Sequence, residues 1–143
     1  MSDVYVSCVI SASATEVWQA IRDFNGLPQW HPIVAESRIE AGLASDQVGC
    51  IRAFTLKDGG RIREQLLALS DYDYTTSYSI LESPMALENY IATLKVSPIT
   101  ETNSAFVEWE AEFDCASDDR DALINQIGQN VFAVGLNALR DKL

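Results

Sequence analysis

Three side chains in this sequence are suited to chemistry inside a folded domain: His31 and Glu64 as acid or base, and Arg52 as a cation that steadies a developing negative charge. Alternate residues of a strand face the same side, so Glu64 shares a face with Leu66 and Ala68. The same parity places Arg52 inward on the preceding strand. Two inward charges on adjacent strands can pair, which offsets the cost of burying either one alone. His31 is the only histidine, and its ordinary pKa of about 6.5 suits a general base.

A structural and a functional role are both open for each of these residues. The pair of Arg52 and Glu64 is either a buried ion pair that fixes strand register or the polar end of a cavity that orients a ligand. If Glu64 were poorly paired, desolvation would raise its pKa and let it shuttle protons. His31 is either a surface-loop histidine beside Pro32 or part of the mouth of that cavity.

Cysteine and glycine patterns give no sign of covalent, metal or nucleotide chemistry. Cys8, Cys50 and Cys115 are widely spaced, which fits neither a disulfide framework nor a zinc site. No nucleophile stands near a base in the sequence. Gly59-Gly60 joins two expected strands and does not open a helix, so it is no phosphate loop. We expect no metal and no cofactor.

The length and the composition, with 48% hydrophobic and 22% charged residues, indicate one globular domain over residues 1–143. The formal net charge of −11 would repel nucleic-acid phosphates and anionic membranes, so neither is an expected partner. No apolar run approaches the roughly 20 residues that a membrane-spanning helix needs. Since the first residues also lack a secretory signal, we expect a cytoplasmic location. The expected oligomeric state is a monomer or a homodimer.

The expected elements are one strand, two short helices, six further strands and one long helix, in that order along the chain. Tyr5–Ser11 is β-branched and aromatic, as in a strand, and Ser13–Glu16 has the capping-box pattern that starts a helix. A second short helical turn is expected within Leu27–Pro32. A long helix is expected from Ser117 to about Leu143. Short connectors favour an antiparallel meander of six further strands: Val34–Ala41, Gly49–Leu56, Arg61–Ser70, Thr75–Glu82, Asn89–Pro98 and Ala105–Asp114.

These elements predict an α+β fold with space for a ligand. A seven-stranded sheet must bury one face, and only one long helix is available to cover it. One helix is too narrow to fill the concave side, so the curved sheet would enclose a cavity. Tyr78, Tyr90 and Trp109 are either core aromatics or cavity walls whose polar groups need a partner. Gly135 either permits close helix packing or makes room for the ligand.

Several short motifs occur in an order that is similar to a known superfamily. They are Val17-Trp18, Ile21-Arg22-Asp23-Phe24, Trp30-His31-Pro32, Val48-Gly49-Cys50-Ile51-Arg52, Arg63-Glu64-Gln65-Leu66, Asn89-Tyr90, and Trp109 with Phe113. In that order they resemble the bacterial polyketide cyclase/dehydrase and lipid transport proteins of the START-like, or Bet v 1-like, superfamily. Plant abscisic acid receptors are more distant relatives. The resemblance implies a helix-grip fold: a seven-stranded curved antiparallel sheet around a long C-terminal helix, with two short helices after the first strand.

The resemblance also implies which side chains would face a ligand. His31 falls where the plant receptors place a lysine that engages the ligand's carboxylate, and Glu64 and Tyr90 match a pocket glutamate and tyrosine. The receptors' gate loop is replaced by the shorter Lys57–Gly60, so receptor behaviour is not expected. With the strand alternation, the candidate ligand-binding residues are His31, Arg52, Phe54, Glu64, Leu66, Tyr78, Tyr90, Trp109, Phe113, Ile127, Val131 and Gly135.

Three functions fit these expectations, because members of this superfamily differ in activity. The favoured one is non-covalent binding of a small hydrophobic molecule that is polyketide-, lipid- or sterol-like, with Lys57–Gly60 and Ser83–Asn89 moving to admit it. The second is a cofactor-free cyclase, dehydratase or isomerase that uses Glu64 or His31 as acid or base. The third is a co-chaperone-like protein-binding module, which would need an exposed apolar patch.

Overall fold

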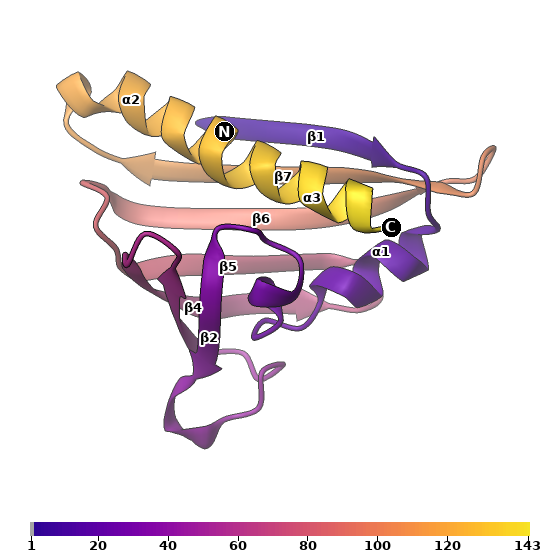
Figure 1. The fold of residues 1–143 in the computed structure, drawn as a ribbon, viewed down its shortest axis with the longest axis horizontal. Coiled ribbons are helices and arrows are strands. Elements are labelled where there is room, and N and C mark those ends of the chain that lie inside the picture. The colour runs from indigo at the N-terminus through magenta and orange to yellow at the C-terminus, as the bar shows by residue number, and fades with distance from the viewer. Residues whose placement is uncertain (1) are drawn as a thin grey trace.

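Seven strands form one antiparallel sheet, and the C-terminal helix lies across one of its faces (Figure 1). This computed structural model describes residues 2–143. The strand order is β1-β7-β6-β5-β4-β3-β2, so the first strand pairs with the last. The expected helix-grip arrangement is confirmed. The strands are β1 Val4–Ile10, β2 Val34–Ile39, β3 Ile51–Leu56, β4 Arg61–Ser70, β5 Thr75–Glu82, β6 Glu88–Ile99 and β7 Ser104–Asp114.

Strand β4 does not keep one alternation along its whole length. Glu64 and Leu66 point inward as expected, but Ala68 is exposed. The pairing of β4 with β5 shifts between Leu66 and Ala68. An irregularity of this kind turns the following side chains to the other face of the sheet. The expectation that Ala68 faces inward is therefore wrong.

Two short helices follow β1 and close one end of the molecule. The Ser13 hydroxyl accepts the backbone N–H of Glu16 at 3.1 Å and caps α1, Ala14–Ile21. The buried indole of Trp18 donates to Asp71 at 2.7 Å and stacks on Tyr74, so α1 is fixed to the turn between β4 and β5. The 3₁₀ turn η1, Leu27–Gln29, then leads directly to the tryptophan and histidine at 30 and 31. A further 3₁₀ turn, η2 (Glu40–Gly42), follows β2.

The C-terminal helix is continuous but not uniform. It begins as the 3₁₀ turn η3, Ser117–Asp119, continues as α2, Arg120–Asn125, and ends as α3, Val134–Lys142. Between them lies the π-helical segment η4, Gln126–Ala133. A π-helix is wider than an α-helix and is common at functional sites. The sequence predicted the extent of the helix but not this segment.

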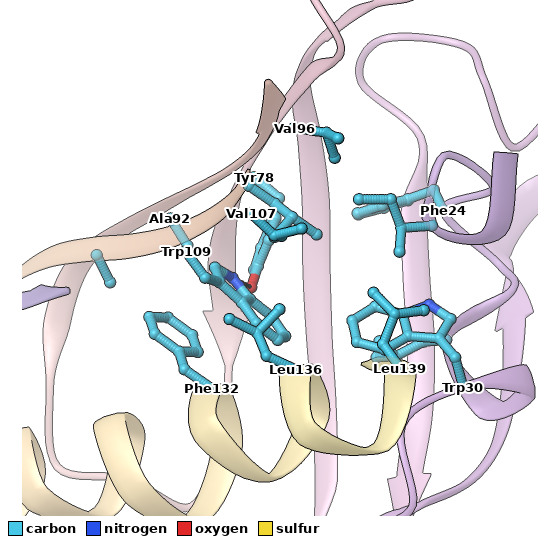
Figure 2. Packing of buried hydrophobic residues seen from close by; sticks show 14 of the residues in the cluster. Phe24, Trp30, Tyr78, Ala92, Val96, Val107, Trp109, Phe132, Leu136 and Leu139 are labelled. Carbon is cyan, nitrogen blue, oxygen red and sulfur yellow. Dashed lines mark hydrogen bonds between the residues drawn. The ribbon is translucent and has the colours of Figure 1, made fainter. Parts of the chain in front are cut away.

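Part of the hydrophobic core lies between the sheet and the C-terminal helix from Phe132 onward. Phe132 stacks on Trp109 with ring centroids 4.4 Å apart. Leu136 and Leu139 follow on the same side of the helix, and Figure 2 shows them pointing toward the sheet and Trp30. All of these side chains are buried, so this end of the helix is anchored by close packing.

Candidate functional site

A pocket of about 740 Å³ lies between η4, the middle of the sheet and two loops, within the roughly 300–1,000 Å³ typical of small-molecule sites. Most of its wall is apolar: Leu27, Pro32, Ile33, Val34, Phe54, Leu56, Ile62, Ile80, Pro84, Met85, Trp109, Ile127 and Val131. Its polar wall residues are His31, Arg52, Lys57, Asp58, Glu64, Tyr78, Tyr90, Gln126 and Asn130. An apolar chamber with a few polar groups is the usual form of a ligand site.

The expected pairing of Arg52 with Glu64 is present in the wall of this pocket. The two residues are direct partners across β3 and β4. Nε and Nη2 of Arg52 lie 2.8 Å and 2.6 Å from Oε1 of Glu64, and Nη1 donates to the backbone carbonyl of Phe24 at 3.0 Å. The guanidinium also lies 4.0 Å from the centre of the Phe24 ring and 4.8 Å from that of Tyr78. The arginine is thus held in place on several sides.

The Glu64 carboxylate is buried together with its partner. Burial raises the pKa of Glu64, and the nearby Arg52 opposes that shift. The pairing stabilises the ionised form. Both close contacts with Arg52 use Oε1, so Oε2 is the carboxylate oxygen that Arg52 does not occupy.

Two phenols lie beside this ion pair. Tyr78 and Tyr90 are buried, with ring centroids 6.4 Å apart. Burial and the negative charge of Glu64 raise the pKa of both phenols, so both stay protonated at neutral pH. The indole N–H of Trp109 donates to the Tyr78 hydroxyl oxygen at 3.1 Å. Tyr78 therefore keeps its own proton for another acceptor.

His31 connects the segment after η1 to the helix. Its side chain is 1% exposed, so the surface-loop interpretation is wrong. Nε2 donates to the backbone carbonyl of Val131 at 2.8 Å, and Nδ1 faces the N–H of Ile33 at 3.5 Å; a carbonyl only accepts, so Nε2 carries the proton. Burial lowers the pKa of His31 to about 4. The ring is neutral at pH 7 and its basic nitrogen faces the backbone.

Gly135 is required by this histidine and not by a ligand. A Cβ at position 135 would lie 2.7 Å from Cδ2 and 2.8 Å from Nε2 of His31, and 3.0 Å from Cζ3 of Trp109. The two distances to His31 are shorter than any ordinary Cβ contact and the distance to Trp109 is tighter than most, so glycine lets the helix approach both side chains this closely. Gly135 does not line the pocket, and the alternative that it makes room for a ligand is wrong.

Most of the other candidate residues meet in the pocket. His31, Arg52, Phe54, Glu64, Tyr78, Tyr90, Trp109, Ile127 and Val131 all line it. Leu66 and Phe113 do not: Leu66 is 1% exposed in the core, and Phe113 stacks behind Tyr90 with centroids 6.3 Å apart. The loop residues Lys57, Asp58, Gly60, Pro84 and Met85 do line the pocket.

The sequence reasoning missed several wall residues. Gln126 and Asn130 are four residues apart on η4 and border the pocket beside Ile127 and Val131. An i, i+4 spacing on the edge of an apolar helix stripe was the available signal. Apolar residues near the second short helix, such as Leu27 and Ile33, gave no periodic signal, because they lie in a 3₁₀ turn and its flanking segment.

Among residues 2–143, the structure brings no three His, Cys, Asp or Glu side chains together in an arrangement that could hold a metal. None of the helices in this range combines the length and hydropathy needed to cross a bilayer.

Structural comparison finds relatives over nearly the whole chain. XoxI from Bacillus cereus is 31% identical, with 97% of this chain and 93% of that chain covered and a TM-score of 0.87. A protein from Thermobifida fusca is 30% identical, with coverages of 97% and 91% and a TM-score of 0.89. Norcoclaurine synthase from Thalictrum flavum, at 17% identity, 97% and 84% coverage and a TM-score of 0.76, shares the fold. No protein with a curated description matches.

The sequence comparison identifies the family. The sequence profile described as polyketide cyclase/dehydrase and lipid transport matches residues 1–143. This match confirms the resemblance seen in the short motifs. The chain therefore belongs to the polyketide cyclase/dehydrase and lipid transport family.

Proposed function

We propose that this protein binds and carries a small, largely apolar molecule in the pocket beneath η4. The observation that carries the proposal is the pocket itself, about 740 Å³ with a mostly apolar wall. Each 100 Å² of apolar ligand surface removed from water would contribute about 2.5 kcal/mol. Polyketide-, lipid- and sterol-like molecules have the size and surface that such a chamber accommodates.

The polar groups are placed to orient the ligand. Glu64, Tyr78 and Tyr90 are buried at the sheet, whereas Lys57 and Asp58 are exposed in the loop between β3 and β4. A bound molecule would thus have a buried polar contact and a second one near solvent. Movement of the Lys57–Gly60 and Ser83–Asn89 loops would admit it.

The relatives support a role in small-molecule binding. The family name includes both cyclases and lipid transport. A structure of norcoclaurine synthase, which has this fold, was solved with dopamine and hydroxybenzaldehyde. The fold of that protein thus accommodates small aromatic molecules.

An enzymatic role is the second candidate, and one observation favours it. Glu64 is a buried carboxylate with a raised pKa in the pocket wall, as a general base would be. His31 is less suited, because Nε2 is bonded to the Val131 carbonyl. With a candidate polyketide substrate, Glu64→Gln should abolish turnover; turnover unchanged by that substitution would exclude this role.

A pocket-filling variant tests the binding proposal. Ile80 lines the pocket, whereas its neighbour Leu81 is 43% exposed and does not line it. Ile80→Trp should weaken binding of a neutral fluorescent probe, N-phenyl-1-naphthylamine, at least about tenfold, since the indole would occupy the ligand's space. Leu81→Trp is the matched control and should leave the affinity unchanged. Equal affinities in both variants would refute the proposal.

Native mass spectrometry of the protein purified from its own host gives an independent test. A co-purifying small molecule in the wild type that is lost in Ile80→Trp would identify the ligand class. Retention of the same molecule by Ile80→Trp would place it outside the pocket.

A further inference from the structure

We propose that the pocket selects a neutral ligand with a hydroxyl group, an alcohol or a phenol, which donates its proton to Oε2 of Glu64, and that it discriminates against carboxylates. This inference rests on the proposed function and adds the chemical class of the ligand's polar group. The preference for a hydroxyl group depends on which polar atoms of Arg52, Glu64 and the two phenols already have a hydrogen-bond partner.

The positive charge of Arg52 is already matched by a negative charge of the protein. Nε and Nη2 of Arg52 contact Glu64, and its Nη1 donates to the carbonyl of Phe24. Each of the three nitrogens therefore already has a protein acceptor. The rings of Phe24, Tyr78 and Phe54, at 4.0, 4.8 and 5.6 Å from the guanidinium carbon, surround it further.

Glu64 offers an acceptor to the pocket. It lines the pocket, its side chain is 7% exposed, and Arg52 occupies only Oε1. An ionised carboxylate accepts hydrogen bonds and donates none. The ligand group that complements Oε2 is therefore a donor.

The charge balance selects a neutral donor. Arg52 and Glu64 are both buried and together carry no net charge. Lys57 also lines the pocket but is exposed in the loop between β3 and β4, so it does not balance a charge at the buried end. There a ligand carboxylate would bring a second negative charge against Glu64, and an ammonium group would leave a net positive charge; either is costly away from water. A hydroxyl group adds no charge.

The phenols complete the site for a hydroxyl group. A hydroxyl that donates to Oε2 still has lone pairs that need a donor. Tyr78 accepts a hydrogen bond from Trp109 and keeps its own proton, and Tyr90 lies beside it. A ligand hydroxyl that donates to the carboxylate and accepts from a phenol would have a partner for its donor and for an acceptor.

Three naphthalene probes of similar size test this at pH 7: 2-naphthol, 2-methoxynaphthalene and 2-naphthoate, titrated into the wild type by calorimetry. We expect 2-naphthol to bind at least about tenfold more tightly than its methyl ether, as for a hydrogen bond to a charged acceptor, and 2-naphthoate to bind most weakly. Since Glu64→Gln alone leaves a buried arginine unpaired, the variant of choice is Arg52→Met combined with Glu64→Leu. In it, the preference for 2-naphthol should fall to within about twofold while the ether still binds.

The outcomes separate this inference from the proposed function. If the three probes bind equally, or 2-naphthoate binds best, the inference is wrong and the binding function stands. If the double variant keeps the preference for 2-naphthol, the assignment to Glu64 is wrong. If none of the probes binds to the wild type, the proposed function fails and this inference with it.

Discussion

The C-terminal helix covers the sheet in two different ways along its length. At the packed end, Phe132, Leu136 and Leu139 are at most 1% exposed and pack on the sheet around Trp109 (Figure 2). At the pocket end, Gln126, Ile127, Asn130 and Val131 border the open volume of about 740 Å³. The same helix and the same sheet therefore form both a close-packed core and a chamber.

The difference between the two ends arises from a few contacts. Gly135 lets the helix approach His31 and Trp109, and the imidazole then bonds to the Val131 carbonyl. These contacts fix the helix where the packed end meets the pocket end. The pocket end then needs no filling side chains to hold the helix in place, so a chamber can persist beside a stable core. Trp109 is the boundary, because it stacks on Phe132 and also lines the pocket.

Truncation at the packed end should have the largest effect on stability. Phe132→Ala removes a fully buried ring and should lower the free energy of unfolding by about 3–5 kcal/mol. Ile80→Ala at the pocket wall should cost about 1 kcal/mol, because the side chain already borders open space. Urea denaturation measures both. Equal losses would mean that the pocket end is packed as tightly as the core.

Breaking the ion pair tests whether the pocket end tolerates a lone charge. Glu64→Leu leaves Arg52 buried without its carboxylate and should cost about 3 kcal/mol or more. Adding Arg52→Met should recover most of the loss, because no charge then remains unpaired. Urea denaturation of the three proteins checks this; a double variant as unstable as the single one would contradict it.

A methyl group at Gly135 should force the packed end apart. Gly135→Ala places a Cβ against the His31 ring and should cost about 2 kcal/mol despite alanine's better helix propensity. Gly128→Ala is the matched control on the same helix, because its Cβ would meet only Val4 Cγ1 at 3.4 Å. That variant should be neutral or more stable. Equal thermal midpoints for both variants would show that the contact with His31 is not tight.

Acidification should destabilise the folded protein by protonating Nδ1 of His31, which is buried and faces the backbone N–H of Ile33. Burial lowers the pKa of His31 from 6.5 to about 4, so the unfolded chain binds the proton more readily than the folded one. The stabilisation is complete above pH 6.5 and is lost as the pH falls toward 4, by about 2 kcal/mol at pH 5. Subtracting the denaturation curves of His31→Gln isolates this effect from that of the carboxylates. Parallel curves between pH 7 and 5 would contradict it.

Some features of the site could be predicted because they depend on local patterns. Strand alternation and short connectors predicted that Arg52 and Glu64 point inward on adjacent strands, since side chains alternate between the two faces. The structure shows that the two residues are direct partners. The Ser13 cap of α1 is equally local. The motif order identified the family, and with it the general position of the pocket.

What depends on contacts between distant segments could not be read from the pattern. The irregularity after Leu66 turned Ala68 outward, and His31 bonds to a carbonyl one hundred residues away. The role of Gly135 followed from that contact. By itself the sequence determined the strands, the helix and the inward charges, because these follow from the backbone period. Only the tertiary structure decided where the helix touches the sheet and where a chamber remains, because that depends on the shapes of side chains brought together from the whole chain.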